Sequence, residues 1–268
     1  MEIIGTGARS WFAWRPSRDT LVAAGSGCVI LALSALMRRF SEVSPVTSIL
    51  LRDVAMLGLV GILYPLWYMQ RRGMGRATFG LHAQRWRRYL ALNLLLAGLL
   101  LAVLRLSQTP SGFSLSGQNW GYVLYVMVAG IFEVVYFYGF QRTLFEQALG
   151  IVPAILLTAV FYSFHHMGFQ TEFLKLFLVG IMYGSIYRMA NSALLIYPFF
   201  WGVGALYDVL VQSQDILPIA HAWQRSIFLI GFMSIAMYLG QRWGLILEEA
   251  TQNTLDRSSE DFYNVRHK

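Results

Sequence analysis

Long apolar stretches separated by short polar segments occupy most of the 268-residue chain. About 20 apolar residues in a helix cross the hydrocarbon core of a bilayer, so each long stretch predicts a membrane-spanning helix. Eight such stretches lie at 20–37, 48–69, 89–105, 120–141, 150–168, 172–190, 192–212 and 225–247. Because the connections between them are short, the pattern predicts an all-α, multi-pass integral membrane protein. Its domain is a bundle of about eight transmembrane helices over residues 19–248.

The two ends of the chain differ from this apolar domain. Residues 1–18 place Trp11, Phe12 and Trp14 among arginines. This mixture is typical of an arm that lies at a membrane interface, and a merely disordered tail is the alternative. Residues 249–268 are polar and are expected to form a cytoplasmic tail.

The composition agrees with a membrane protein. The chain is 56% hydrophobic and 13% charged, whereas a soluble domain carries about 25% charged residues. The net charge of +7 comes largely from arginines near helix ends, so it does not indicate nucleic-acid binding. Cys28 is the single cysteine, which excludes an intrachain disulfide and a cysteine metal cluster.

The distribution of arginines predicts how the bundle is oriented. Residues 70–89 contain six arginines and no acidic residue, so the positive-inside rule places this loop in the cytoplasm. With eight spans, the N- and C-termini are then both predicted to be cytoplasmic. Arg38 and Arg39 fall on the opposite side and argue against this orientation.

Three ionisable residues lie inside apolar stretches. Glu133 is in the fourth stretch, and His165 and His166 are adjacent in the fifth. Such groups are costly at membrane depth, and they usually persist because they serve a function or make a specific contact. These residues are therefore the first candidates for a functional site.

Counting along the helices places these groups at similar depths. Glu133 is 15 residues before Ala148, where the fourth helix is expected to end, and His165 is 15 residues after Gly150. At about 1.5 Å per residue, both lie about 22 Å from the turn between the two helices. Counted from Ser192, which is expected on the same side of the membrane, Asp208 lies at a depth of about 24 Å. These groups are thus able to meet in one cavity.

A carboxylate and an imidazole on either side of a water molecule can form a hydrolytic centre. Glu133 would accept the proton as general base, and His165 would hold the water or protonate the leaving group. His166 is expected to point about 100° away from His165 on the helix. Only two ligands then remain where a catalytic zinc has three, so no metal is predicted. Ligation of haem iron or a chlorophyll-type pigment by His165 or His166 is an alternative; otherwise no cofactor is predicted.

The motifs around these residues resemble those of the CAAX-protease and bacteriocin-processing membrane family (CPBP, also called Abi). The resemblance covers about residues 125–212. It rests on Glu133 followed by Phe137 and Gly139, on Phe161-x-x-x-His165, on Gly180-x-x-x-Gly184-x-x-Tyr187, and on Asn191-Ser192. It implies an intramembrane endopeptidase that cleaves a hydrophobic or lipidated peptide, with Glu133 and His165 activating water.

Two of the three family motifs are incomplete in this chain. The first motif is Glu-Glu-x-x-x-Arg, and its second and last positions are Val134 and Tyr138 here. The third motif, His-x-x-x-Asn or Asp, falls on Phe200 and Gly204. The family's carbonyl-polarising residues are therefore missing. The candidates to replace them are His166, Tyr136, Tyr138 and Asp208.

Two classes of function remain open on this basis. The first is a divergent endopeptidase in contact with the lipid bilayer. The alternative is a catalytically inactive family member that acts as a scaffold in a membrane-protein complex, or holds a lipid, pigment or other cofactor. A transporter is less well supported, because the chain has no inverted repeat with paired broken helices.

Overall fold

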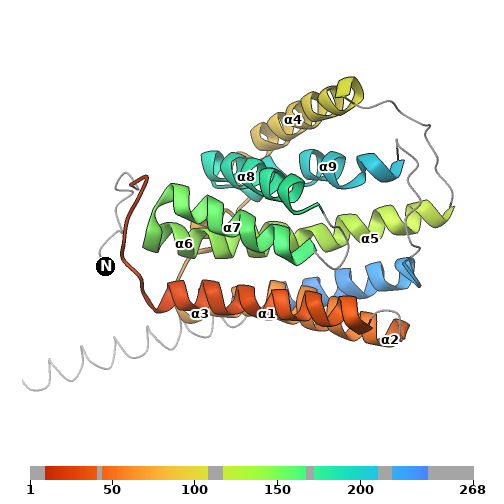
Figure 1. Ribbon diagram of the computed structural model, residues 1–268, viewed down its shortest axis with the longest axis horizontal. Helices are drawn as coiled ribbons and strands as arrows, with labels where there is room; N and C mark the ends of the chain where they lie inside the picture. Colours follow the sequence, from red (N-terminus) through yellow and green to blue (C-terminus); the bar gives the residue numbers. More distant parts are fainter. Residues whose placement is uncertain (1–9, 41–43, 108–116, 167–171, 211–218, 241–268) are drawn as a thin grey trace, which may run out of the picture.

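The computed structural model describes residues 10–40, 44–107, 117–166, 172–210 and 219–240, and all regular elements within these ranges are helical (Figure 1). The elements are α1 (Arg18–Phe40), α2 (Pro45–Ser48), η1 (Ile49–Leu63), α3 (Tyr64–Arg71), η2 (Arg76–Phe79), α4 (Trp86–Ser107), α5 (Gly117–Glu133), η3 (Val134–Gln141), α6 (Arg142–Leu149), α7 (Ile151–His165), α8 (Phe173–Ala190), η5 (Ala193–Leu195) and α9 (Phe199–Leu210). The helix Ala222–Gly240 follows.

Each of the eight expected apolar segments contains a helix within the described part of the chain. Among the residues that the structure describes, six helices are long and apolar enough to cross a membrane, namely Arg18–Phe40, Pro45–Arg71, Trp86–Ser107, Asn119–Leu149, Phe173–Ala190 and Ala222–Gly240. The other two, α7 and α9, have 15 and 12 helical residues in the described part of the chain. The predicted all-α class is confirmed, and the chain is an integral membrane protein. Its predicted orientation stays a prediction.

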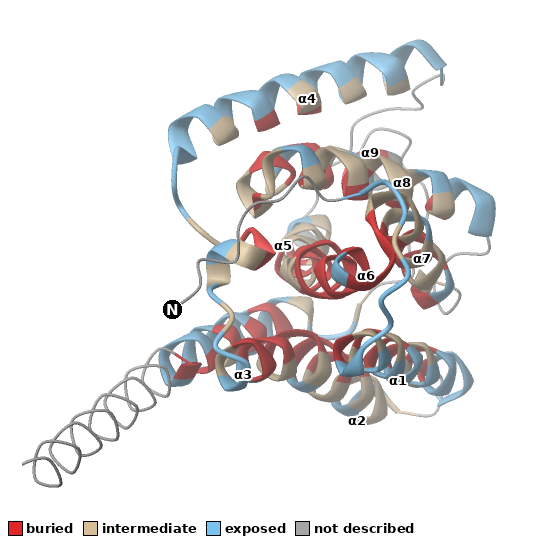
Figure 2. Ribbon diagram, turned by 90° about the vertical axis from the view of Figure 1, so that its left-hand side faces the viewer, coloured by how far each residue is buried: buried red, intermediate tan, exposed pale blue. Residues whose placement is uncertain are grey.

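The continuous helix formed by α5, η3 and α6 runs through the middle of the bundle. In the end-on view of Figure 2, α6 is surrounded by other helices and is almost wholly buried, whereas α4 exposes most of its surface. Helices α1 and η1–α3 cover one side of the central helix, and α7, α8 and α9 cover the other (Figures 1 and 2). The residues of the central helix are therefore the ones most shielded from lipid.

Two stretches of the bundle, η1 and η3, are wound as π-helices. π-Helical turns are rare and occur frequently at functional sites. Glu133 is the last residue of α5 and directly precedes η3. The change of winding in the central helix therefore coincides with the candidate carboxylate.

A buried ionic network joins the elements at the end of the bundle where α6 meets α7. Arg142 is fully buried and donates to Glu146, one turn later on α6. Glu146 also accepts a hydrogen bond from Nε of Arg188 on α8 (2.8 Å). Nη2 of Arg142 donates to Asn191 (3.1 Å), whose side-chain amide donates to the carbonyl of Ala77 (2.9 Å). The network thus ties α6, α8 and the arginine-rich loop together.

The N-terminal segment 10–15 passes over the turn between α6 and α7. Its backbone donates from Ala13 N to Leu149 O and from Arg15 N to Ala148 O, both at 2.8 Å. Its three aromatic side chains remain exposed. This exposure suits an arm at a membrane interface, and that role stays a prediction.

A second buried charge cluster lies near the other end of the central helix. Asp53 on η1 is fully buried, and its carboxylate accepts hydrogen bonds from Nε and Nη2 of Arg225 at 2.6 and 2.8 Å. It also accepts one from the hydroxyl of Tyr125 on α5 (2.6 Å), and Nε of Arg52 is 3.6 Å away. The cluster therefore joins η1, α5 and the helix Ala222–Gly240.

Candidate functional site

Glu133, His165 and His166 meet in the interior of the bundle, where the end of α5 faces the end of α7. One carboxylate oxygen of Glu133 and one ring nitrogen of each histidine all lie within 4.8 Å of one another. Oε1 of Glu133 is 3.3 Å from Nε2 of His166. Glu133 and His165 are buried, and His166 is half-buried. Glu133 and His165 thus share one depth, in agreement with the residue count.

His166 does not turn away from His165, so that expectation was wrong. The two ring centroids are 4.9 Å apart. His166 follows the last residue of α7, and its Nδ1 is 2.9 Å from the carbonyl oxygen of Tyr162, which folds the ring back along the helix. The angle of about 100° is the rotation between successive residues around the helix axis. It does not fix where the two imidazole rings lie, and here the rings bend toward each other. The argument that only two metal ligands are present therefore fails.

The ring of His165 is held in place by α1. Its Nδ1 is 2.9 Å from Oγ of Ser34, whose hydroxyl donates to the carbonyl of Ile30 (3.0 Å). The ring also packs against Phe132 and Phe137, at centroid distances of 5.4 and 5.5 Å. Its orientation is thus set by an aromatic wall and one polar contact from a distant helix. Sequence reasoning missed Ser34, because a serine in an apolar helix carries no distinctive signal.

Trp201 on α9 is a site residue that sequence reasoning also missed. Its Nε1 donates to Oε2 of Glu133 (3.1 Å), the carboxylate oxygen that does not face His166. The indole lies against Gly130, one turn before Glu133, where a Cβ atom would overlap the ring. Trp201 directly follows Phe200, the first position of the incomplete third motif. A search for donors one residue away from that motif would have found it.

The second position of the third motif, Gly204, leaves room for a neighbouring side chain. A Cβ atom at Gly204 would overlap the hydroxyl of Tyr183. That hydroxyl lies within hydrogen-bond distance of the carbonyl oxygens of Phe200 (3.3 Å) and Trp201 (3.4 Å). The side chain of Asn93 on α4 accepts from the backbone N–H of Phe200 (2.7 Å). Two polar side chains therefore fix the turn of α9 that carries Trp201.

The remaining candidates for a supporting role lie differently. The hydroxyl of Tyr136 is 2.7 Å from Oγ of Ser26 on α1. The ring of Tyr138 packs against that of Tyr162, with centroids 5.7 Å apart. Asp208 belongs to α9, but its side chain lies outside the described part of the structure, so its role stays a prediction. His166 is thus the supporting candidate that contacts Glu133 directly.

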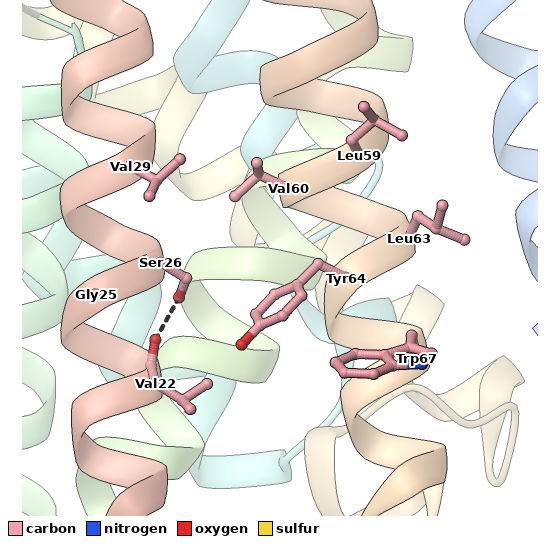
Figure 3. A pocket seen from close by; sticks show the side chains of 9 residues that line it. All are labelled: Val22, Gly25, Ser26, Val29, Leu59, Val60, Leu63, Tyr64 and Trp67. Atoms are coloured by element: carbon pink, nitrogen blue, oxygen red, sulfur yellow. Dashed lines mark hydrogen bonds between the residues drawn. The ribbon is translucent and has the colours of Figure 1, made fainter.

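An apolar groove of about 650 Å³ opens between α1 and η1–α3 (Figure 3). Its lining is almost entirely aliphatic and aromatic: Val22, Gly25, Ser26, Val29, Leu59, Val60, Leu63, Tyr64 and Trp67. The hydroxyl of Ser26 donates to the carbonyl of Val22 (2.7 Å), so its polarity is satisfied within α1. A groove of this kind on membrane-spanning helices suits a hydrocarbon chain.

The comparisons with known proteins agree with the motifs. Residues 114–206 match the family described as type II CAAX prenyl endopeptidase Rce1-like. This region includes Glu133, His165, His166 and Trp201. No curated protein and no solved structure matches the chain. The match supports the resemblance inferred from the motifs, and over residues 114–206 the chain is similar to this CAAX-protease-like family of membrane proteins.

Proposed function

We propose that this protein is an intramembrane endopeptidase in which Glu133 activates the water that attacks the scissile peptide bond. The observation that supports this most directly is the contact between a buried carboxylate and an imidazole nitrogen, Glu133 Oε1 to His166 Nε2 at 3.3 Å. His165 completes a cluster of three groups able to exchange protons. The cluster lies inside the region that matches a family of prenyl endopeptidases.

In the proposed reaction, Glu133 accepts a proton from water as the water oxygen bonds to the peptide carbonyl carbon. An imidazole of the pair then delivers a proton to the departing amine, and the carbon–nitrogen bond breaks. Trp201 is a positioning residue, because its N–H holds the second oxygen of Glu133 (3.1 Å) and leaves the first one facing His166.

The rate of this reaction depends on stabilising the oxyanion that forms on the carbonyl. Phe200 and Gly204 have no side-chain donor at the positions where the family has its carbonyl-polarising pair. Loss of one oxyanion donor costs about 10²–10³ in rate. We therefore propose His166 as the replacement donor and expect slow turnover compared with family members that keep the full motif.

The proposed substrate is a hydrophobic or prenylated peptide. The site lies deep in a helical bundle, and a polar peptide would pay a large desolvation cost to reach that depth. The name of the matched family also indicates prenylated substrates. The groove between α1 and η1–α3 offers apolar surface for such a lipid group.

The test measures cleavage of a fluorogenic prenylated peptide by the purified protein in liposomes, with the products identified by mass spectrometry. Glu133→Gln keeps the shape of the side chain but removes the base, and is expected to lower the rate about 10²–10⁴-fold. Glu172→Gln is the matched control, because Glu172 is an exposed glutamate paired with Lys175 on the surface. Background rates for wild type, Glu133→Gln and Glu172→Gln alike would refute the proposal.

The apolar groove favours a second candidate, a catalytically inactive scaffold that holds the acyl chain of a bilayer lipid. Gly25→Leu is expected to fill the groove and to reduce the amount of lipid that copurifies. Gly231→Leu is the control, because a Cβ atom meets nothing within 4 Å at either glycine. Equal lipid content in both variants and wild type would contradict this candidate. An absorption spectrum of the purified protein tests the haem and pigment alternatives.

A further inference from the structure

We infer that the apolar groove between α1 and η1–α3 binds an anionic phospholipid, with one acyl chain in the groove and the phosphate between Arg18 and Arg71. The inference rests on the acyl-chain binding of the second candidate function, and it adds the class of lipid that is bound. It holds whether or not the protein cleaves peptides. A prenyl group that enters the same groove would displace the acyl chain.

The groove has the length and direction of an acyl chain in one leaflet. One wall runs along α1 from Val22 to Val29, and the other runs along η1–α3 from Leu59 to Trp67 (Figure 3). At 1.5 Å per residue the walls are about 10–12 Å long, and one leaflet of the hydrocarbon core is about 15 Å thick. Val29, Leu59 and Trp67 are exposed, so the groove opens toward the surrounding lipid.

The groove by itself does not select one lipid over another. A Cβ atom at Gly25 meets nothing within 4 Å, so there is open space along α1. The hydroxyl of Ser26 is engaged by the carbonyl of Val22 and the hydroxyl of Tyr136, both at 2.7 Å. Lipid tails are as apolar as these aliphatic side chains, so an acyl chain gains little by entering. Any selection therefore comes from polar groups at the end of the groove.

Two arginines lie one helical turn beyond that end. Arg18, the first residue of α1, is four residues before Val22. Arg71, the last residue of α3, is four residues after Trp67. Residues four apart on a helix share a face, so both arginines lie on the faces that line the groove. The guanidinium of Arg71 is 5.3 Å from the centre of the Trp67 ring, which places it beside the groove.

The carboxylate at this end of the two helices is already engaged by other groups. Asp19 lies 3.2 Å from Nη2 of Arg72 and accepts a hydrogen bond from the hydroxyl of Tyr68 (2.5 Å). This contact also shows that the ends of α1 and α3 lie side by side, so Arg18 and Arg71 flank the engaged pair. Both arginines are exposed. Among the described residues, they are thus available to an anion from outside the protein.

Phosphate is the anion that the membrane supplies at this level. Trp67 has the amphipathic ring typical of the membrane–water interface, so Arg71, one turn further on, lies among the headgroups. The predicted orientation places this end at the cytoplasmic surface, where anionic lipids are present. Each arginine near that surface strengthens binding of an anionic lipid about 5-fold. Two arginines therefore predict a preference of about 25-fold over a zwitterionic lipid.

The experiment uses the full-length protein in nanodiscs that contain equal amounts of phosphatidylglycerol and phosphatidylcholine with identical acyl chains. The protein is extracted into mild detergent, and the lipid that stays bound is identified by native mass spectrometry. Wild type is expected to keep one phospholipid and to favour phosphatidylglycerol about 25-fold. Arg18→Gln and Arg71→Gln are each expected to lower this preference about 5-fold. Gly25→Leu is expected to lower the binding of both lipids alike.

Arg87→Gln is the matched control. Arg87 is exposed and lies 5.3 Å from the ring of Trp86, the same distance as between Arg71 and Trp67, but Trp86 does not line the groove. This variant is expected to keep the preference of wild type. The thermal unfolding midpoint of each variant shows that it is folded.

Three results would overturn the inference. The first is equal retention of the two lipids by wild type; if Gly25→Leu still loses the bound lipid, the groove holds an acyl chain without selecting its headgroup. The second is an equal loss of preference in Arg71→Gln and Arg87→Gln, which would assign the preference to the charge of the whole surface. The third is a copurifying protein, in place of a lipid, that Gly25→Leu removes. None of these measurements depends on peptide cleavage.

Discussion

The substitution Arg225→Met removes the main partner of Asp53, a carboxylate without exposed surface on η1. Arg225 supplies two hydrogen bonds to this carboxylate, at 2.6 and 2.8 Å. The hydroxyl of Tyr125 remains at 2.6 Å, and Nε of Arg52 remains at 3.6 Å. The variant therefore keeps a buried negative charge while losing its closest positive one.

Removing one partner of a buried ion pair costs about 3–5 kcal/mol, mostly because the other charge stays buried. Since Tyr125 and Arg52 still contact Asp53 in the variant, the lower end of about 3 kcal/mol is expected. At roughly 2–4 °C per kcal/mol for a chain of this size, the unfolding midpoint falls by about 6–12 °C.

The assay is thermal unfolding of the purified protein in detergent, compared with two further variants. Lys175→Met is the control, because Lys175 and its partner Glu172 are both exposed and lie 2.9 Å apart. Exposed pairs of this kind contribute about 0–1 kcal/mol. The double variant Asp53→Leu/Arg225→Met replaces the pair by apolar groups, and is expected to recover most of the lost stability.

Two results would refute this reasoning. One is an equal fall in the unfolding midpoint for Arg225→Met and Lys175→Met, which would mean that burial of Asp53 does not matter. The other is a double variant as unstable as Arg225→Met alone, which would mean that packing of the arginine stem, and not the stranded carboxylate, sets the cost.

Two further substitutions test the site and the other charge cluster. Trp201→Phe keeps an aromatic ring but removes the N–H that holds Glu133. A hydrogen bond to a charged group contributes about 1.5–3 kcal/mol, so kcat/KM for peptide cleavage is expected to fall about 10–100-fold. An unchanged kcat/KM would exclude a positioning role for Trp201. Glu146→Gln removes the negative charge that contacts both Arg142 and Arg188. It is expected to lower the free energy of unfolding by about 3–5 kcal/mol, measured by thermal unfolding. A decrease below about 1 kcal/mol would be inconsistent with a buried network.

The helices were predictable because membrane insertion depends on a local property. An apolar run of about 20 residues predicts a spanning helix whatever it packs against. Glu133 and His165 were predictable for a related reason, since each is an isolated ionisable group in such a run and a residue count along straight helices gives its depth. The count placed the two at equal depths, and they do lie in one cluster.

The partners of these residues were not predictable in the same way. Trp201 is 68 residues from Glu133, and Ser34 is 131 residues from His165. Neither residue type stands out in a chain with 8 tryptophans and many apolar helices. The position of His166 was predicted wrongly, because the rule for backbone angles does not include its hydrogen bond to the carbonyl of Tyr162.

The sequence by itself thus determined that the chain is an all-α membrane protein whose second half is similar to the CAAX-protease-like family, with a carboxylate and an imidazole at the same depth. Hydrophobic length and motif spacing carry this information along the chain. Only the tertiary structure decided which atoms face one another: that both histidines turn toward Glu133, and that an indole N–H holds the carboxylate from α9. Such contacts depend on how helices distant in sequence pack and rotate, which a pattern along one helix does not contain.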